Sequence, residues 1–439
     1  MHNKNEKILR VYIFIVLYSS LLKLVLGRWG TIVSDIATVC VLIMSLKNHG
    51  KYGIRLNKTI RNIFILVVIV QLLSIAEIFN PNIQNTLYSV IEYRKSYFQV
   101  LSLLAAYWIY KKSNDDMLGT FQYIGNISAP IIFYGIKQYF LWGDIDSKLV
   151  DMTDANFYTM YYGGHMRSVS IFSGPFHYGM FCAFMFAIYV FLFSECRIKS
   201  HRRLYLVLAI FSVAGSVCSI TRTSLVCIII CLGIWFLLYL QKKKNTSAVV
   251  VKFLTAITLI MIATVIVTGV VGLPFANNDS SLGRMLSSLG NLGEDNRFMS
   301  RTSTWTEGIQ YVIKSPIFGY GMGAAADTMS SYNISNIYLT SHSMYIKMFM
   351  EIGVIGGIIY LSIFLLCAKK IIKKKRNSNA VRVLYISMLS TVLLNGLVGS
   401  TIPSFPSMTI YWIITGILLA QSDLIQTQLQ KLRQSDLSK

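Results

Sequence analysis

The sequence has few charged residues for its length, and most of them carry one sign. Charged residues make up 14% of the 439, with 41 Lys and Arg against 19 Asp and Glu, while 54% are hydrophobic. An ordinary soluble domain has about 25% charged residues. Apolar runs of about twenty residues recur along the whole chain, and each is long enough to cross a bilayer. The composition therefore excludes a soluble globular protein and indicates a membrane protein.

Disulfide and metal frameworks are also absent. The seven cysteines all fall in predicted spans or a cytoplasmic loop, so an oxidising outer compartment finds no pairs to join. No Cys/His spacing suggests zinc, and neither a metal nor a cofactor is predicted. The first apolar stretch is followed by Lys23 and by Gly27-Arg28, with no small-residue cleavage site. We therefore expect a retained helix and not a cleaved signal peptide.

The apolar runs predict an all-α, polytopic integral membrane protein with about twelve transmembrane helices. We treat residues 1–439 as a single membrane domain. The predicted spans are 8–26, 30–46, 62–79, 88–109, 117–141, 169–193, 204–220, 223–240, 249–272, 345–368, 380–402 and 405–420.

Basic residues predict the orientation of these spans, because cytoplasmic loops are enriched in Lys and Arg. One set of alternate loops and the two termini together hold 26 of them, and the other set holds eight. Both termini are therefore predicted to be cytoplasmic. The net charge of +22 mostly reflects this bias, so no nucleic-acid partner is inferred.

Two outer segments, 142–168 and 273–344, are much longer than the other connections. Long loops of this kind are usually functional or disordered. The second, between spans 9 and 10, contains an expected amphipathic helix over 301–314, with Trp305, Ile309 and Val312 at helical spacing. We find no repeat between the two halves of the chain, which argues against a transporter built from matched halves. The asymmetry favours a catalytic or binding platform on the outer face.

Four arginines stand out by position: Arg94 inside the fourth span, Arg167 before the sixth, Arg222 in the turn between the seventh and eighth, and Arg301 at the start of the amphipathic helix. A charge near the bilayer is costly and usually has a partner or a function. Guanidinium groups bind phosphate oxygens bidentately, so these arginines would suit a lipid-linked diphosphate. The structural alternative pairs Arg94 with Glu77 or Glu92 and lets Arg167 and Arg222 snorkel.

His342 lies just before the tenth span, where membrane meets water. A neutral imidazole there could take a proton from a sugar hydroxyl, and the alternative is an interfacial hydrogen-bonding histidine. His165 and His177 flank the other outer loop and are weaker candidates. Four carboxylates lie in that loop. They either keep the loop soluble or form a paired-carboxylate hydrolase site, which their spacing does not select. They are Asp144, Asp146, Asp151 and Asp154.

The segment from Arg301 to Gly356 resembles the signature region of the O-antigen ligase/polymerase family, which includes Wzy-type polysaccharide polymerases. The matching positions are Arg301, Trp305, Pro316, Gly319, Gly321, His342-Ser343, Gly353 and Gly356. Residues 167–179 and the turn around Arg222 are similar to two further family segments. In that turn, Thr221 and Thr223 replace the family's serine and small residue. Asn80-Pro81-Asn82 followed by Arg94 is similar to a segment of capsule polymerases.

The resemblance implies a metal-independent, inverting glycosyltransferase of the bacterial inner (plasma) membrane, with undecaprenyl-diphosphate-linked oligosaccharide as donor and acceptor and a chain-length regulator as a possible partner. His342 and Arg301 would then be catalytic. Arg222, Arg167, Arg94 and Trp305 would bind substrate.

Three other functions stay open: an O-antigen ligase acting on a lipid or protein acceptor, a repeat-unit flippase, and an outer-face sensor or structural protein. A flippase predicts charged residues lining the bundle core and no need for His342.

Overall fold

The computed structural model describes residues 4–47, 56–113, 116–152, 160–162, 165–240, 296–325, 334–337, 339–373 and 377–437. Within these ranges the protein is built almost entirely of helices, which confirms the predicted all-α class. They are α1 (Lys4–Tyr18), α2 (Lys23–Leu26), α3 (Ile32–Lys47), α4 (Lys58–Ala76), α5 (Thr86–Ser96), α6 (Leu101–Lys111), α7 (Met117–Phe140), α8 (Asp144–Asp151), α10 (Pro175–Glu195), α11 (Lys199–Cys218), α12 (Arg222–Leu240), α15 (Asn296–Lys314), α16 (Met344–Ile371), α17 (Asn379–Val398) and α18 (Ser407–Leu437).

Three short 3-10 helices and one small strand pair complete the described structure. The 3-10 helices are η1 (Gly27–Thr31), η2 (Glu77–Phe79) and η3 (Phe98–Val100). Strands β1 (Tyr161–Tyr162) and β2 (His165–Met166) pair antiparallel, with Tyr161 opposite Met166.

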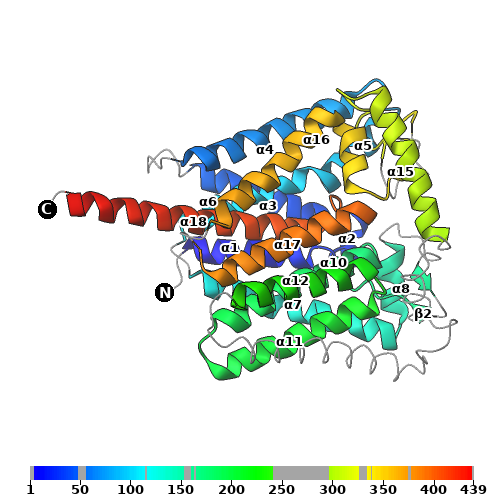
Figure 1. Cartoon of the computed structure of the whole chain (residues 1–439). Coiled ribbons are helices and arrows are strands. Elements are labelled where there is room, and N and C mark those ends of the chain that lie inside the picture. The colour runs from blue at the N-terminus through cyan, green and yellow to red at the C-terminus, as the bar shows by residue number, and fades with distance from the viewer. Residues whose placement is uncertain are drawn as a thin grey trace.

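The long helices run side by side and give the molecule two ends (Figure 1). Both chain termini lie at one end, where α18 extends beyond the bundle. Helices α8 and α15 and strand β2 lie at the opposite end. The elements predicted to be outside the membrane are thus on the side away from the termini. We call this the distal end.

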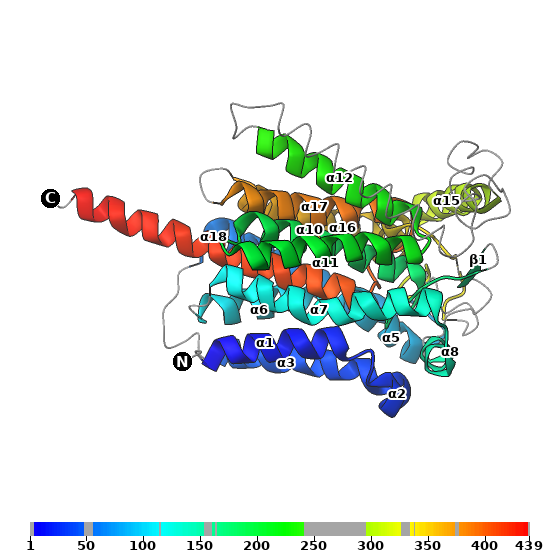
Figure 2. The same cartoon turned by 90° about the horizontal axis from the view of Figure 1, so that it is seen from below.

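Helices α10 and α18 form the centre of the bundle (Figure 2). Every residue from Tyr178 to Leu192 is buried, and so is every residue from Met408 to Ala420. A helix that is apolar all round suits such a position because neighbours cover every face. Gly416 lets α18 approach α6 closely, since an added Cβ would lie 2.4 Å from the Leu103 carbonyl oxygen.

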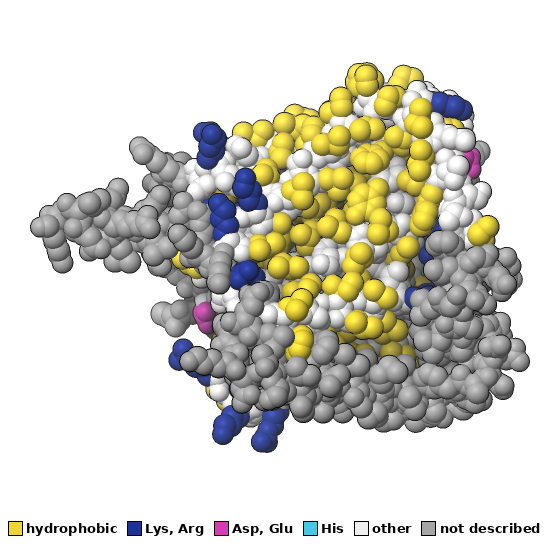
Figure 3. All heavy atoms as spheres, viewed as in Figure 1, with side chains coloured by type: hydrophobic (Ala, Val, Ile, Leu, Met, Phe, Trp, Pro, Cys, Tyr) yellow, Lys and Arg dark blue, Asp and Glu magenta, His cyan; other side chains and the backbone are white. Residues whose placement is uncertain are grey.

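Seven segments in the described part of the chain are long and apolar enough to cross a membrane. They are Lys4–Leu26, Lys58–Phe79, Pro175–Glu195, Lys199–Cys218, Met344–Ile371, Asn379–Val398 and Ser407–Ile425. On the face in Figure 3, hydrophobic side chains cover the middle, and Lys and Arg gather mostly toward the end with the termini. The count of twelve stays a prediction, and the predicted span 249–272 lies outside the described residues.

The predicted span 88–109 is not one helix. It is divided into α5, η3 and α6. A break in a helix releases backbone carbonyls, which must find other donors when water is excluded. Here the Gln71 amide donates to the Tyr97 carbonyl at 2.9 Å, and the Gln99 amide donates to the carbonyls of Lys95 and Ile402. These side chains stabilise a bend that an apolar count alone does not reveal.

Candidate active site

Helix α15 carries Arg301 and Trp305 across the distal end of the bundle (Figure 1). It begins five residues before the predicted 301–314. Trp305 and Val312 pack against a buried cluster that includes Leu339 and Ile346, but Ile309, expected on the same face, is 53% exposed. Arg301 itself is half-buried. Packing of Trp305 fixes the helix one turn from Arg301, which supports a positioned guanidinium.

Gly353 of the family-like motif is explained by backbone docking between residues 316–320 and a kink in α16. At Ile352 and Gly353 the backbone leaves the helical conformation, with φ +68° at Gly353. The freed groups are then used by the loop: Tyr320 N donates to the Met350 carbonyl at 2.6 Å, and Val354 N donates to the Pro316 carbonyl at 2.7 Å. A Cβ on Gly353 would lie 1.9 Å from the Ile317 carbonyl oxygen. Only glycine fits so close a backbone contact.

His342 occupies the last step before α16, in a left-handed conformation with φ +44°. Its side chain is half-buried, between the buried residues Ser341 and Ser343. Ser341 Oγ donates to the Ser343 carbonyl at 3.1 Å, and Ser343 Oγ donates to the Gly396 carbonyl at 3.3 Å. Strained backbone of this kind clusters at functional sites. The two hydroxyls stabilise the turn that carries His342 and connect it to α17.

The Arg167 side chain hydrogen-bonds to the backbone of the turn that precedes Arg222. Its Nε donates to the Ser219 carbonyl at 3.1 Å and its Nη2 to the Ile220 carbonyl at 3.3 Å. Ile220 has φ +50°, which is strained for a β-branched residue. The structure therefore brings Arg167 and Arg222 together. In these contacts Arg167 positions the turn, whereas Arg222 starts α12 and is half-buried.

A third strained residue, Ser170, orients the segment that carries Arg167. Ser170 has φ +53°, and its backbone N–H donates to Gln138 Oε1 at 2.6 Å while Gln138 Nε2 returns a bond to the Ser170 carbonyl at 3.0 Å. Gln138 on α7 is fully buried. Gln138 was not predicted as a functional residue. Its place near the end of an apolar span was the available indication, because a polar side chain there usually has a buried partner.

Two contacts connect the Arg222 turn to the start of α10. Thr221 Oγ1 donates to the Pro175 carbonyl at 3.3 Å, and Gly179 has no room for a side chain because its Cβ would lie 2.6 Å from Ser224 Oγ. His177, one of the weaker candidates, lies two residues farther along α10 from Pro175. It is hydrogen-bonded through Nδ1 to Ser404 Oγ at 2.6 Å, and this bond makes it a structural tie to the segment before α18.

The segment before α18 also contacts the start of α16, close in sequence to His342. Thr401 Oγ1 donates to Met344 Sδ at 2.9 Å. Met344 follows His342 by two residues and packs against Gly396. On the other side of α16, Gly308 of α15 approaches Ile346, where an added Cβ would lie 2.5 Å from Cγ2. The elements that carry Arg222, Arg301 and His342 are therefore joined by a continuous series of contacts around the distal end.

Arg94 is placed differently from this group. It forms an ion pair with Asp35 and a hydrogen bond with Thr31, both on the α3 side. The alternative partners Glu77 and Glu92 were wrong: Glu77 accepts a bond from Asn80 at 2.7 Å, and Glu92 contacts lysines. Asp35 was missed because it lies 59 positions away in sequence.

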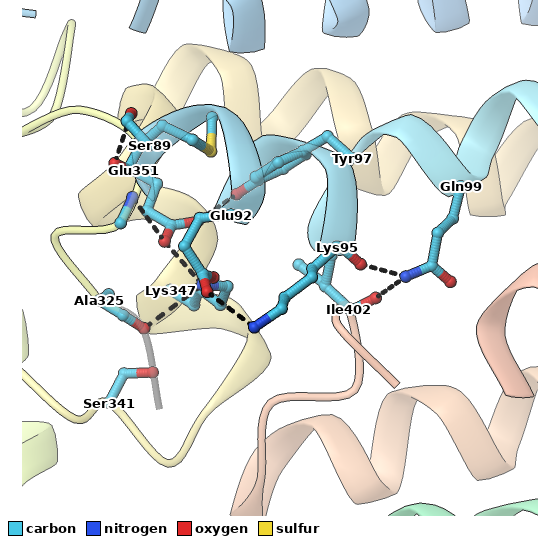
Figure 4. Close-up of polar contacts among 12 residues, drawn as sticks. Ser89, Glu92, Lys95, Tyr97, Gln99, Ala325, Ser341, Lys347, Glu351 and Ile402 are labelled. Atoms are coloured by element: carbon cyan, nitrogen blue, oxygen red, sulfur yellow. Dashed lines mark hydrogen bonds and ion pairs between the residues drawn. The ribbon is translucent and has the colours of Figure 1, made fainter. Parts of the chain in front are cut away.

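A buried charge cluster next to the site was also missed (Figure 4). Lys347 Nζ lies 2.6 Å from Glu351 Oε1 and 3.5 Å from Glu92 Oε2, and all three side chains are buried. Glu351 accepts from Gly323 N at 3.2 Å and from the Tyr97 hydroxyl at 3.1 Å. The cluster ties α5 and α16 to the loop of residues 319–323, which we call the glycine loop. A Lys and a Glu four apart in an otherwise apolar span were the available signal.

Among the predicted outer carboxylates, Asp146 has a structural role. Asp146 is buried and accepts bonds from Tyr134 OH at 2.6 Å, Lys137 Nζ at 2.6 Å and Gly143 N at 2.7 Å. Burial tends to raise its pKa, but these bonds outweigh that effect and hold the pKa below its ordinary value. Asp154 and the His165 side chain lie outside the described part. Among described residues, no group of three His, Cys, Asp or Glu could hold a metal ion.

Residues 204–361 match the protein-family model described as O-antigen ligase. The chain carries a domain of the O-antigen ligase family. The match begins in α11 and ends in α16, so it contains Arg222, Arg301, Trp305 and His342, whereas Arg94 and Arg167 precede it. The resemblance to the O-antigen ligase/polymerase family is thereby confirmed. No curated protein matches the chain.

The matched family is one of membrane glycosyltransferase-like enzymes, and the match supports a role in O-antigen-related polysaccharide biosynthesis. Together with the apolar helices, it identifies a membrane protein. The family match does not favour a flippase.

Proposed function

We propose that this protein is a glycosyltransferase that polymerises undecaprenyl-diphosphate-linked oligosaccharide repeat units on the outer face of a bacterial inner membrane. One observation carries the proposal. Arg222, Arg301 and His342 all fall within the O-antigen ligase match, and their elements are joined at the distal end of the bundle. With the termini cytoplasmic, as the loop charges predict, this end faces the compartment where a flipped donor presents its diphosphate.

The residue roles follow from charge and position. Arg301 and Arg222 bind the donor diphosphate and stabilise the negative charge that develops on it as the glycosidic bond breaks. His342 accepts the proton of the attacking sugar hydroxyl. The hydroxyl oxygen displaces the diphosphate from the anomeric carbon in a single step, which inverts the configuration at that carbon. Arg167 acts through the 219–221 turn and sets the position of Arg222. In this scheme the arginines supply the counter-charge to the diphosphate, so the proposal is of a metal-independent transfer.

An O-antigen ligase is the second candidate, and the matching family model carries that description. A ligase uses the same lipid-linked donor but transfers finished glycan to a different acceptor. Donor-binding arginines and a base for the acceptor hydroxyl serve both reactions. The two candidates therefore differ in acceptor and not in the chemistry of the site.

The deciding experiment compares glycans in cells that carry the wild-type gene or the His342→Ala variant. Loss of a polymerase leaves single repeat units that are still transferred onward, since ligation is another enzyme's task. Loss of a ligase leaves long chains on undecaprenyl diphosphate. We expect the single-unit pattern, with the variant protein present in the membrane. Removal of a general base slows a reaction by about a hundredfold to ten-thousandfold, enough to eliminate long chains. Long lipid-linked chains would establish the ligase instead, and unchanged glycans would remove His342 from the mechanism.

A further inference from the structure

Helix α5 presents a carboxylate and an ammonium group whose hydrogen-bonding capacity is incompletely used. Glu92 is 2% exposed, yet its Oε1 has no hydrogen-bond partner among the residues that the structure describes. Lys95 Nζ lies 3.8 Å from that oxygen, beyond hydrogen-bonding distance, and the Lys95 side chain is 30% exposed. An unsatisfied buried carboxylate oxygen is costly and calls for an explanation such as an absent ligand or water.

The other Glu92 oxygen belongs to the buried charge cluster. Oε2 lies 3.5 Å from Lys347 Nζ, which also pairs with Glu351. Figure 4 shows the Glu92 carboxylate between Lys347 and Lys95. Lys347 thus fixes the carboxylate and leaves Oε1 directed to the Lys95 side. Because Lys95 is partly exposed, movement of its side chain would open this side of Glu92 to a ligand.

Among the described residues, the charges of Lys95 and the buried cluster together balance. Two lysines, Lys95 and Lys347, face two glutamates, Glu92 and Glu351. A diphosphate would meet the negative Glu92 and gain no net attraction, in contrast to the arginines of α12 and α15. A carboxylate accepts hydrogen bonds and an ammonium group donates them. A neutral ligand with neighbouring hydroxyl groups fits both.

The pair lies close to the proposed site of transfer. Lys347 follows Ser343 by one helical turn, which is about 6 Å along α16 from the residue next to His342. The Gln99 amide donates to the carbonyls of both Lys95 and Ile402, so the same segment that contacts Met344 is tied to Lys95.

We propose that Glu92 and Lys95 form a saccharide subsite, in which one sugar hydroxyl donates to Glu92 Oε1 and a neighbouring hydroxyl oxygen accepts from Lys95 Nζ. The ligand is a neutral sugar of the lipid-linked repeat unit, so the inference rests on the proposed function. The subsite recognises glycan, whereas Arg222 and Arg301 recognise diphosphate.

The test measures binding and not turnover. Purified full-length protein in lipid nanodiscs is titrated with two probes: the lipid-linked repeat unit extracted from cells that lack the gene, and undecaprenyl diphosphate without sugar. We expect Lys95→Met and Glu92→Gln to weaken binding of the repeat unit about 10-fold to 100-fold, the scale of hydrogen bonds to charged groups. Binding of undecaprenyl diphosphate stays unchanged. Lys148→Met, an exposed lysine of α8 at the same end, is the matched control and changes neither.

The outcomes separate the two proposals. Wild-type affinity for both probes in Lys95→Met would overturn the subsite, and equal weakening for both would show a phosphate site in its place. A wild-type protein that binds neither probe would overturn the proposed function and the subsite with it. Glu92→Gln also removes a contact of Lys347. If that variant fails to fold, Lys95→Met decides the test, because it leaves the buried Lys347–Glu351 pair intact.

Discussion

Lys347 Nζ lies 2.6 Å from Glu351 Oε1, one turn farther along α16, and neither side chain has exposed surface. The pair is at the level where the glycine loop docks, because Gly323 N also donates to Glu351. A buried ion pair adds little net stability, but the removal of one partner leaves a buried charge uncompensated. We infer that this pair specifies how α5, α16 and the loop fit together.

Lys347→Met should therefore destabilise the protein strongly, by about 3–5 kcal/mol. The variant leaves Glu351 and Glu92 buried without their shared cation. The measurement is the apparent melting temperature of detergent-solubilised protein, with Lys148→Met as the unaffected control. The double variant Lys347→Met/Glu351→Gln should recover part of the loss, and a double variant less stable than Lys347→Met would contradict this account.

Gly353→Ala should abolish accumulation of folded protein. The added Cβ would lie 1.9 Å from the Ile317 carbonyl oxygen, at a residue with φ +68°. Gly233 is the control, since it lies within α12 and nothing is within 4 Å of its added Cβ. Gly233→Ala should be neutral or stabilise by up to about 1 kcal/mol through helix propensity. Membrane abundance measured by immunoblotting distinguishes the two, and normal levels of Gly353→Ala would disprove the backbone-docking explanation.

His342→Asn should separate the backbone role of His342 from its chemistry. Asparagine tolerates the left-handed conformation with φ +44°, but its amide cannot accept a proton at neutral pH. We expect normal melting behaviour and loss of about 100-fold or more in the rate of transfer. His342→Val should in addition destabilise the protein because a β-branched residue resists this conformation. An active His342→Asn variant would show that the imidazole is not the base.

Arg301→Lys should be nearly as damaging to transfer as Arg301→Ala. Lysine keeps the charge but lacks the planar group that binds two phosphate oxygens at once. Because Arg301 is half-buried on α15, whose position Trp305 and Val312 secure, neither variant should unfold the helix. The assay is incorporation of labelled lipid-linked repeat units into polymer by purified protein. If Arg301→Lys polymerises at the wild-type rate, bidentate recognition is not the role of Arg301.

Asp146 should make stability depend on acid pH. Its pKa is lower in the folded protein than its ordinary value of 3.8. The unfolded chain therefore binds the proton more tightly, so the contribution of Asp146 is complete above that value and is lost as the pH falls through the folded pKa. Asp146→Asn should melt at a lower temperature than wild type at neutral pH, and the difference should shrink in acid. A difference that grows on acidification would reverse the sign of this argument.

The apolar runs were sufficient to predict the fold class, and the positions of a few residues together with the family-like motif supplied the candidate site. Burial of backbone in lipid permits little other than helices, so an apolar run about twenty residues long dictates its own secondary structure. The motif residues Arg301, Trp305 and His342 were likewise visible because they occur at fixed spacings in the chain, and the family match to residues 204–361 contains all three.

Only the tertiary structure decided how the polar groups are paired. Arg94 contacts Asp35, Arg167 contacts Ser219, and Lys347 contacts Glu92, across 59, 52 and 255 positions. Sequence spacing cannot reveal such pairs, because a charge in an apolar interior takes whichever partner the packing of distant helices brings within reach. The same reason applies to Gly353. Its place in a motif was evident from the chain, but its necessity arises from the Ile317 carbonyl that lies against it.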